Sequence, residues 1–175
     1  MGSLDRNHHF NERNFSCKAV NLKEGLNLRK VHFQDYVDKV KAMATEDDIV
    51  IGHSMGGLIV QKYLEESTAP AAVLLASLPV KGVFRTTLRI ALRHPLAFLK
   101  ANLTWSLYPL IGKPKLTREA FFSMDILPDT LNGYFSLMQD ESYLAFLDMM
   151  LLKLPNPEKV STELLITGAE NDTIF

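Results

Sequence analysis

Hydrophobic and polar residues alternate along the chain in two patterns, one typical of helices and one of strands. From Phe33 to Ala44 the apolar residues recur at helical spacing, with charged residues between them, which predicts an amphipathic helix lying on a sheet. A second helix is expected from Met55 to about Glu66. Aliphatic runs at Ile49–Ile51, Ala71–Ala76 and Glu163–Thr167 predict short strands, the first of them buried on both faces, and Phe15–Leu22 alternates weakly and predicts a further strand. Strands separated by helices imply an α/β fold with a mostly parallel sheet flanked by helices.

The region from Pro79 to about Pro157 has a different character, because it lacks β-branched runs. Apolar residues recur at helical spacing in residues 85–99, 118–122 and 142–154, and prolines interrupt the pattern. We interpret 79–157 as a helical insertion that caps a partial α/β core made of residues 1–78 and 158–175. An equally simple interpretation is a set of helices packed around a larger α/β domain, although such a long connection exceeds what a crossover needs.

Composition excludes several classes of protein. The 175 residues contain 19 Lys and Arg against 20 Asp and Glu, a net charge of −1, and 47% are hydrophobic, which is typical of globular domains. Nothing in this balance favours nucleic acid or an anionic membrane as a partner. No apolar run reaches the ~18 residues of a transmembrane helix. The lone Cys17, expected to be buried, and a polar start without a secretory signal favour the cytoplasm.

One motif carries candidate chemistry. Gly52-His53-Ser54-Met55-Gly56 is a G-x-S-x-G pattern placed where a predicted strand meets a predicted helix, and Gly57 follows it. On a sharp strand-to-helix turn the serine Oγ projects above the sheet, and glycines let the two backbones approach closely. The backbone N–H of Met55, at the start of the helix, would point toward a developing oxyanion. The simpler alternative is a glycine-rich turn with no catalytic role.

The motif and its surroundings resemble the α/β-hydrolase superfamily, in particular its lysophospholipase-like and esterase-like members. The resemblance extends to the helix at 33–40, the strand at 73–77 and the strand and turn at 164–172. It implies a serine hydrolase that cleaves carboxylic esters through an acyl-enzyme on Ser54, with Met55 as an oxyanion donor and Gly52 and Gly56 as the glycines of the nucleophile elbow. It further implies Asp172 as the catalytic acid, with Glu170 a weaker candidate, and no metal or organic cofactor. An apolar cap favours a small-molecule ester with an apolar acyl group.

The catalytic base is the missing part of this pattern. His53 adjoins Ser54, but we expect it to pack beneath the turn, and none of His8, His9, His32 and His94 occupies the position that a triad requires. In the superfamily the histidine follows the acid, whereas three residues follow Asp172 here, and no His-Gly oxyanion loop precedes Phe15. We therefore expect the central part of a larger hydrolase that lacks both ends of the domain. The alternative function is a catalytically inactive remnant with at most a binding role.

Overall fold

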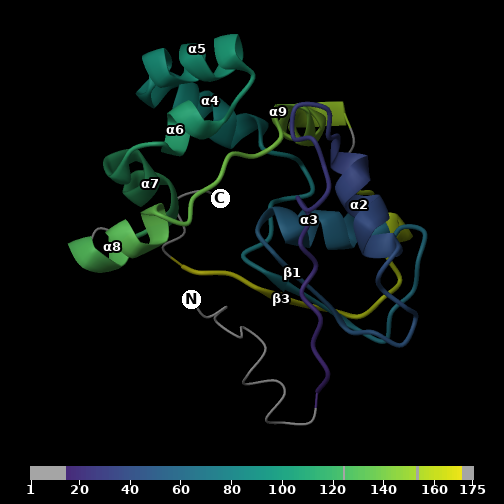
Figure 1. The fold of residues 1–175 in the computed structure, drawn as a ribbon. Coiled ribbons are helices and arrows are strands. Elements are labelled where there is room, and N and C mark those ends of the chain that lie inside the picture. Colours follow the sequence, from purple (N-terminus) through teal and green to yellow (C-terminus); the bar gives the residue numbers. More distant parts are fainter. Residues whose placement is uncertain (1–14, 124, 153, 171–175) are drawn as a thin grey trace.

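A parallel three-stranded sheet forms the centre of the molecule. The computed structural model describes residues 15–123, 125–152 and 154–170, and its strands are β1 (Val50–His53), β2 (Ala72–Leu75) and β3 (Leu164–Thr167). They lie in the order β1-β2-β3, with Ile51 opposite Val73 and Val73 opposite Leu165. The predicted α/β class is confirmed, since all three strands are parallel and helices surround them (Figure 1).

Helix α3 (Met55–Tyr63) packs on one face of this sheet, and helix α2 (Phe33–Lys41) packs against α3. The helical spacing of the apolar residues explains why, because Phe33 and Tyr36 of α2 are fully buried against Leu58 and Ile59 of α3. The predicted helices thus end within three residues of their expected positions. Asp35 accepts a hydrogen bond from the N–H of His32 at 2.7 Å, which satisfies a donor at the start of α2.

Within the described part of the chain, the opposite face of the sheet is open. Ile51 is 48% exposed and Leu165 is 61% exposed, and both point away from α3. The prediction that Ile49–Ile51 is buried on both faces is therefore wrong. The aliphatic run at 49–51 is typical of a strand that is buried on both faces, but among the described residues no helix packs on this side of the sheet.

The predicted strand at Phe15–Leu22 is also wrong. Residues 15–21 have no regular structure and 22–25 form turns, with Phe15 exposed and Cys17 half-buried rather than buried. A strand requires a paired neighbour, and within the described ranges β1 pairs with β2 alone. Weak alternation without a pairing partner does not produce a strand.

The segment between β2 and β3 is helical, as predicted. Prolines stand in the first turn of four of its described helices, which suits their fixed φ and missing N–H. The helix expected over 85–99 is split at His94, because Pro95 begins a new one. The elements are α4 (Phe84–Arg93), α5 (Pro95–Thr104), α6 (Tyr108–Ile111), α7 (Pro114–Phe121), α8 (Pro128–Phe135), α9 (Tyr143–Leu147), a π-helical turn (Asp148–Leu152) and a 3-10 turn (Pro157–Lys159).

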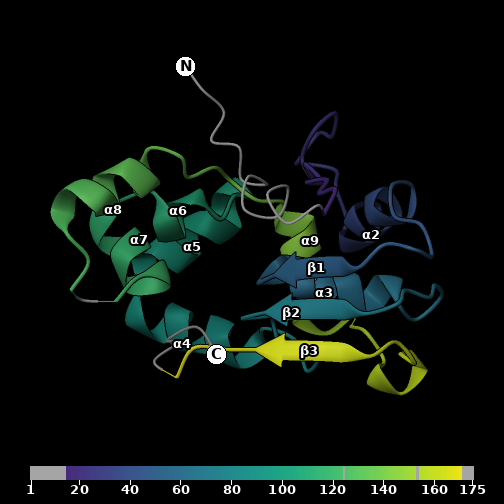
Figure 2. The ribbon, with the colours of Figure 1, turned by 90° about the horizontal axis from the view of Figure 1, so that it is seen from below.

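The helical segment lies at the carboxyl ends of the strands. Figure 2 shows the arrowheads of β1, β2 and β3 directed toward the group α4 to α8. Its two ends also enter the main core, since Val83, Ala145 and Met149 are buried in one apolar cluster with Leu58 and Leu74. The segment therefore stands beside the strand ends, where ligands bind in open parallel sheets.

Candidate active site

Ser54 occupies a strained turn between β1 and α3. Its φ of 53° and ψ of −120° lie in a region that residues with a side chain rarely adopt. The backbone is held there by hydrogen bonds: the Ser54 N–H donates to the Leu75 carbonyl at 3.0 Å, and the Ser54 carbonyl accepts from the N–H groups of Gly57 and Leu78 at 3.0 and 3.1 Å. The end of β2 thus fixes the serine at the carboxyl edge of the sheet.

Two glycines make this turn sterically possible. A Cβ on Gly52 would lie 2.4 Å from the carbonyl oxygen of Gly56, and a Cβ on Gly57 would lie 2.4 Å from Ser77 Oγ. A Cβ on Gly56 would meet no atom within 4 Å. Close backbone approach therefore depends on Gly52 and Gly57, while Gly56 contributes its main chain.

A buried polar network supports the turn from below, and no motif in the sequence predicts it. Gln61 of α3 is buried, and its Nε2 donates to the Gly57 carbonyl and to Ser77 Oγ, both at 3.2 Å. Ser77 Oγ in turn donates to the Leu78 carbonyl at 3.0 Å. The network ties the first turn of α3 to the chain after β2, where Ala76 also has a positive φ of 40°.

The N-terminus of α3 offers a free donor beside the serine. Met55 is the first helical residue, so its N–H has no intrahelical acceptor, and no acidic residue occupies the first turn. Within the described part of the chain, neither this N–H nor the Ser54 hydroxyl makes a hydrogen bond. Both groups are therefore available to a ligand.

None of the described histidines makes a hydrogen bond to Ser54. His53 is exposed on the open face of the sheet, so the expectation that it packs beneath the turn is wrong: Gly52 faces α3, and its neighbour in the strand must face the other way. His32 Nδ1 lies 2.9 Å from Asp148, and His94 Nε2 lies 3.0 Å from Glu119. His8 and His9 lie outside the described residues.

Of the two candidate acids, only Glu170 lies within the described residues. Asp172 itself lies outside the described residues, whereas Glu170 is exposed shortly after the end of β3. Because β2 separates β1 from β3, the two strand ends are about 10 Å apart. A carboxylate at the end of β3 therefore stands about two strand spacings (~10 Å) from the end of β1, where Ser54 begins its turn.

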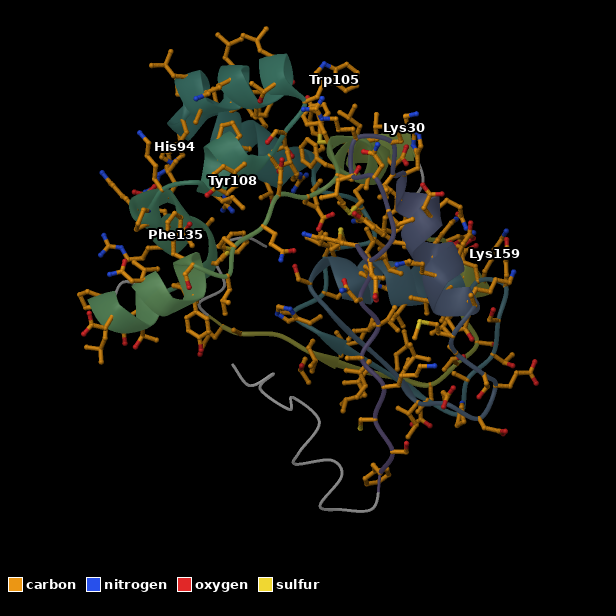
Figure 3. All side chains as sticks on the ribbon, viewed as in Figure 1. Lys30, His94, Trp105, Tyr108, Phe135 and Lys159 are labelled. Carbon is orange, nitrogen blue, oxygen red and sulfur yellow. The ribbon has the colours of Figure 1, made fainter. Side chains whose placement is uncertain are left out.

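A cavity of about 910 Å³ lies in the helical segment and does not reach Ser54. It is bounded by α5, α6, the start of α7, the turn at 28–30 and the irregular residues 140–141, and Lys100, Trp105 and Tyr108 line it. Figure 3 shows the Tyr108 side chain on the inner side of this helical group. The cavity and the strained serine are separate features of the molecule.

Comparison with known families agrees with this geometry. A family model described as the alpha/beta hydrolase family matches residues 8–173, which is nearly the whole chain. The protein therefore belongs to the alpha/beta hydrolase family and is a hydrolase by class. Comparison with curated proteins gives no match. Among the described residues, no helix is long and apolar enough to cross a membrane.

Proposed function

We propose that this protein is a serine hydrolase that cleaves carboxylic esters through an acyl-enzyme on Ser54. The observation that carries the proposal is the turn at Ser54, where a positive φ presents the hydroxyl beside the unpaired N–H of Met55. A structural glycine-rich turn has no need of a strained non-glycine residue at its centre. Membership of the alpha/beta hydrolase family supports the same chemistry.

In the proposed reaction, Ser54 Oγ attacks the ester carbonyl carbon and gives up its proton to a general base. The carbonyl oxygen becomes an oxyanion that accepts a hydrogen bond from the Met55 N–H. Collapse of this intermediate breaks the bond to the alkoxy group, which leaves as the alcohol with the proton. Water then attacks the acyl-enzyme by the same steps and releases the carboxylic acid.

The base and its partner follow from the family resemblance. That resemblance assigns the acid to Asp172, with Glu170 as the second choice, and the base to a histidine that follows the acid in sequence, a position that residues 1–175 do not contain. The separation of about 10 Å between the ends of β1 and β3 supports an imidazole bridging the serine and the acid.

The acyl group of the substrate is proposed to be apolar. The helical segment at the carboxyl ends of the strands carries exposed aromatic side chains, among them Phe84, Trp105 and Phe121. Closing such a cap over the serine would exclude water and favour an apolar ligand. A small-molecule ester in the cytoplasm fits these features and the absence of a second cysteine.

A second candidate is a chain that binds ligands without turning them over. It is favoured by the Ser54 hydroxyl, which has no basic partner among the described residues. A serine hydroxyl without an adjacent base is a weak nucleophile.

Hydrolysis of p-nitrophenyl esters distinguishes the two candidates. For the hydrolase we expect Ser54→Ala to abolish turnover and kcat/KM to rise from the acetate to the octanoate ester. Ser136→Ala, at an exposed serine of the helical segment, is the matched control and should retain full activity. Equal rates for the wild-type chain and Ser54→Ala would favour the non-catalytic candidate instead.

A further inference from the structure

Helices α4 and α5 expose leucines that a globular protein would normally bury. Leu92 is 76% exposed and Leu96 is 82% exposed, the highest values for large apolar side chains in the described part of the chain. They stand on either side of the break at His94, where the two contacting helices meet. Leu88 on α4 and Leu99 and Leu103 on α5 continue this exposed apolar surface. The α4–α5 surface, as we call these five leucines and the arginines described next, is unusual in its exposure.

Arginines accompany the leucines of α4. Arg85, Arg89 and Arg93 follow one another at intervals of four residues, so they form a stripe along one side of the helix. Together with Leu88 and Leu92 they line a shallow depression of about 500 Å³. Arg93 lies 3.8 Å from Glu119, yet its side chain stays 67% exposed. The helix therefore presents a basic stripe directly beside an apolar one.

The sequence around this helix pair is free of acidic residues. From residue 67 to residue 118 there is no Asp or Glu, although the chain as a whole has a net charge of −1. The overall balance, which does not favour an anionic partner, thus conceals a strongly basic segment. Its cations are Lys81, Arg85, Arg89, Arg93, Lys100, Lys113, Lys115 and Arg118.

We propose that the α4–α5 surface docks on an anionic phospholipid bilayer. Leu92 and Leu96 would enter the boundary between headgroups and acyl chains, while the arginine stripe binds lipid phosphates. Amphipathic helices with leucine on one face and arginine on the other bind bilayers in this way. Charge complementarity selects anionic lipid, because each arginine near such a surface adds about 1 kcal/mol of attraction.

This lipid binding goes beyond the proposed ester hydrolysis and does not need Ser54 chemistry. Lipid binding would place the carboxyl edge of the sheet near a source of apolar ester substrates. Since binding and turnover are measured separately, failure of one leaves the other intact.

Co-sedimentation of the full chain with vesicles tests the proposal. We expect binding to phosphatidylcholine vesicles that contain phosphatidylglycerol, weak binding to pure phosphatidylcholine, and release by salt. Leu92→Ser/Leu96→Ser should lower the partition coefficient at least about tenfold, from lost apolar burial. Arg85→Gln should lower it about fivefold. All variants change exposed side chains, and far-UV circular dichroism verifies their fold.

Two matched controls distinguish binding through the α4–α5 surface from non-specific binding to vesicles. Leu137→Ser removes a leucine outside these helices that is 67% exposed, and Lys159→Gln removes an exposed cation that Figure 3 shows far from them. Neither should change binding. Failure to bind anionic vesicles, equal binding to neutral vesicles, or an equal loss in Leu137→Ser would overturn the proposal. So would a dimer that Leu92→Ser/Leu96→Ser dissociates in the absence of lipid, since it would assign the leucines to a second copy.

Discussion

Gly52 and Gly56 are in direct backbone contact: a Cβ on Gly52 would lie 2.4 Å from the Gly56 carbonyl oxygen and 2.6 Å from the carbonyl carbon. The end of strand β1 and the first turn of helix α3 therefore touch through their main chains. This contact is what allows Ser54 to stand at the top of the turn.

Gly52→Ala should accordingly be destabilising. The added methyl group meets backbone that cannot rotate away, so we expect a loss of about 1–3 kcal/mol in the free energy of unfolding. Gly56→Ala is the matched control, since its Cβ would be unopposed, and higher helix propensity should make it neutral or stabilising by up to about 1 kcal/mol. Urea unfolding of the two variants measures both effects. Equal destabilisation would show that the turn is not packed as described.

Gly57 and Ser77 should behave as a coupled pair. Gly57→Ala alone places its Cβ 2.5 Å from the Ser77 Cβ, whereas Ser77→Gly removes that atom. We expect the double variant to be more stable than the sum of the single changes predicts, by about 1 kcal/mol or more. A double-mutant cycle in urea provides the number, and strict additivity would contradict the contact.

Tyr36 should make stability sensitive to alkaline pH. Burial, and then the hydrogen bond that its hydroxyl donates to Glu141, raise the pKa of Tyr36 well above its ordinary value. The folded state therefore retains this proton at a pH where the unfolded chain loses it. The contribution is complete below pH about 10 and declines as the pH rises further.

Tyr36→Phe tests this linkage. It should cost about 1.5–3 kcal/mol at neutral pH, where the hydrogen bond to the carboxylate is lost. It should also flatten the fall in unfolding free energy above pH about 10. Chemical unfolding across that range is the measurement. An unchanged slope in Tyr36→Phe would mean that another group causes the alkaline loss.

The open face of the sheet should promote self-association. Ile51 and Leu165 lie on this face in register with Val73 between them, and both are largely exposed. We expect the chain to oligomerise with concentration in analytical ultracentrifugation and to bind a hydrophobic dye. Ile51→Lys/Leu165→Lys should suppress both, while Leu137→Lys should not. A monomer at all concentrations would show that these exposed side chains do not cause self-association.

Local periodicity predicted the fold where contacts are local. The helix at 33–41 and the strands at 50–53, 72–75 and 164–167 follow from apolar spacing and short aliphatic runs. Burial on one sheet face accompanies the first two strands, whereas the third is largely exposed and is held by its pairing with β2. The break at His94 was obscured, although Pro95 marks it, because the apolar spacing continues through it.

Three predictions failed because they depend on which other segment packs against or pairs with a given element. Phe15–Leu22 was expected to be a strand, but no described strand pairs with it, and Ile51 was expected to be buried on a face that stays open. His53 was misplaced for the same reason, since its exposure follows from which sheet face is covered.

The candidate site was predictable in part. The spacing of Gly52, Ser54 and Gly56 predicted a strand-to-helix turn, and the structure has one there. The support from Gln61 and Ser77 was not predictable, because it joins residues from separate elements without a local pattern. Asp172 and the catalytic role of Ser54 stay predictions.

Labelling with an alkyl fluorophosphonate tests the central proposal most directly, because this probe forms a covalent adduct only with an activated serine. The labelled chain would be digested and the modified peptide sequenced by mass spectrometry. The account predicts one adduct, on Ser54, absent from Ser54→Ala and retained in Ser136→Ala. A folded chain that stays unlabelled, or that carries the adduct on another serine, would contradict the assignment of Ser54 as the nucleophile.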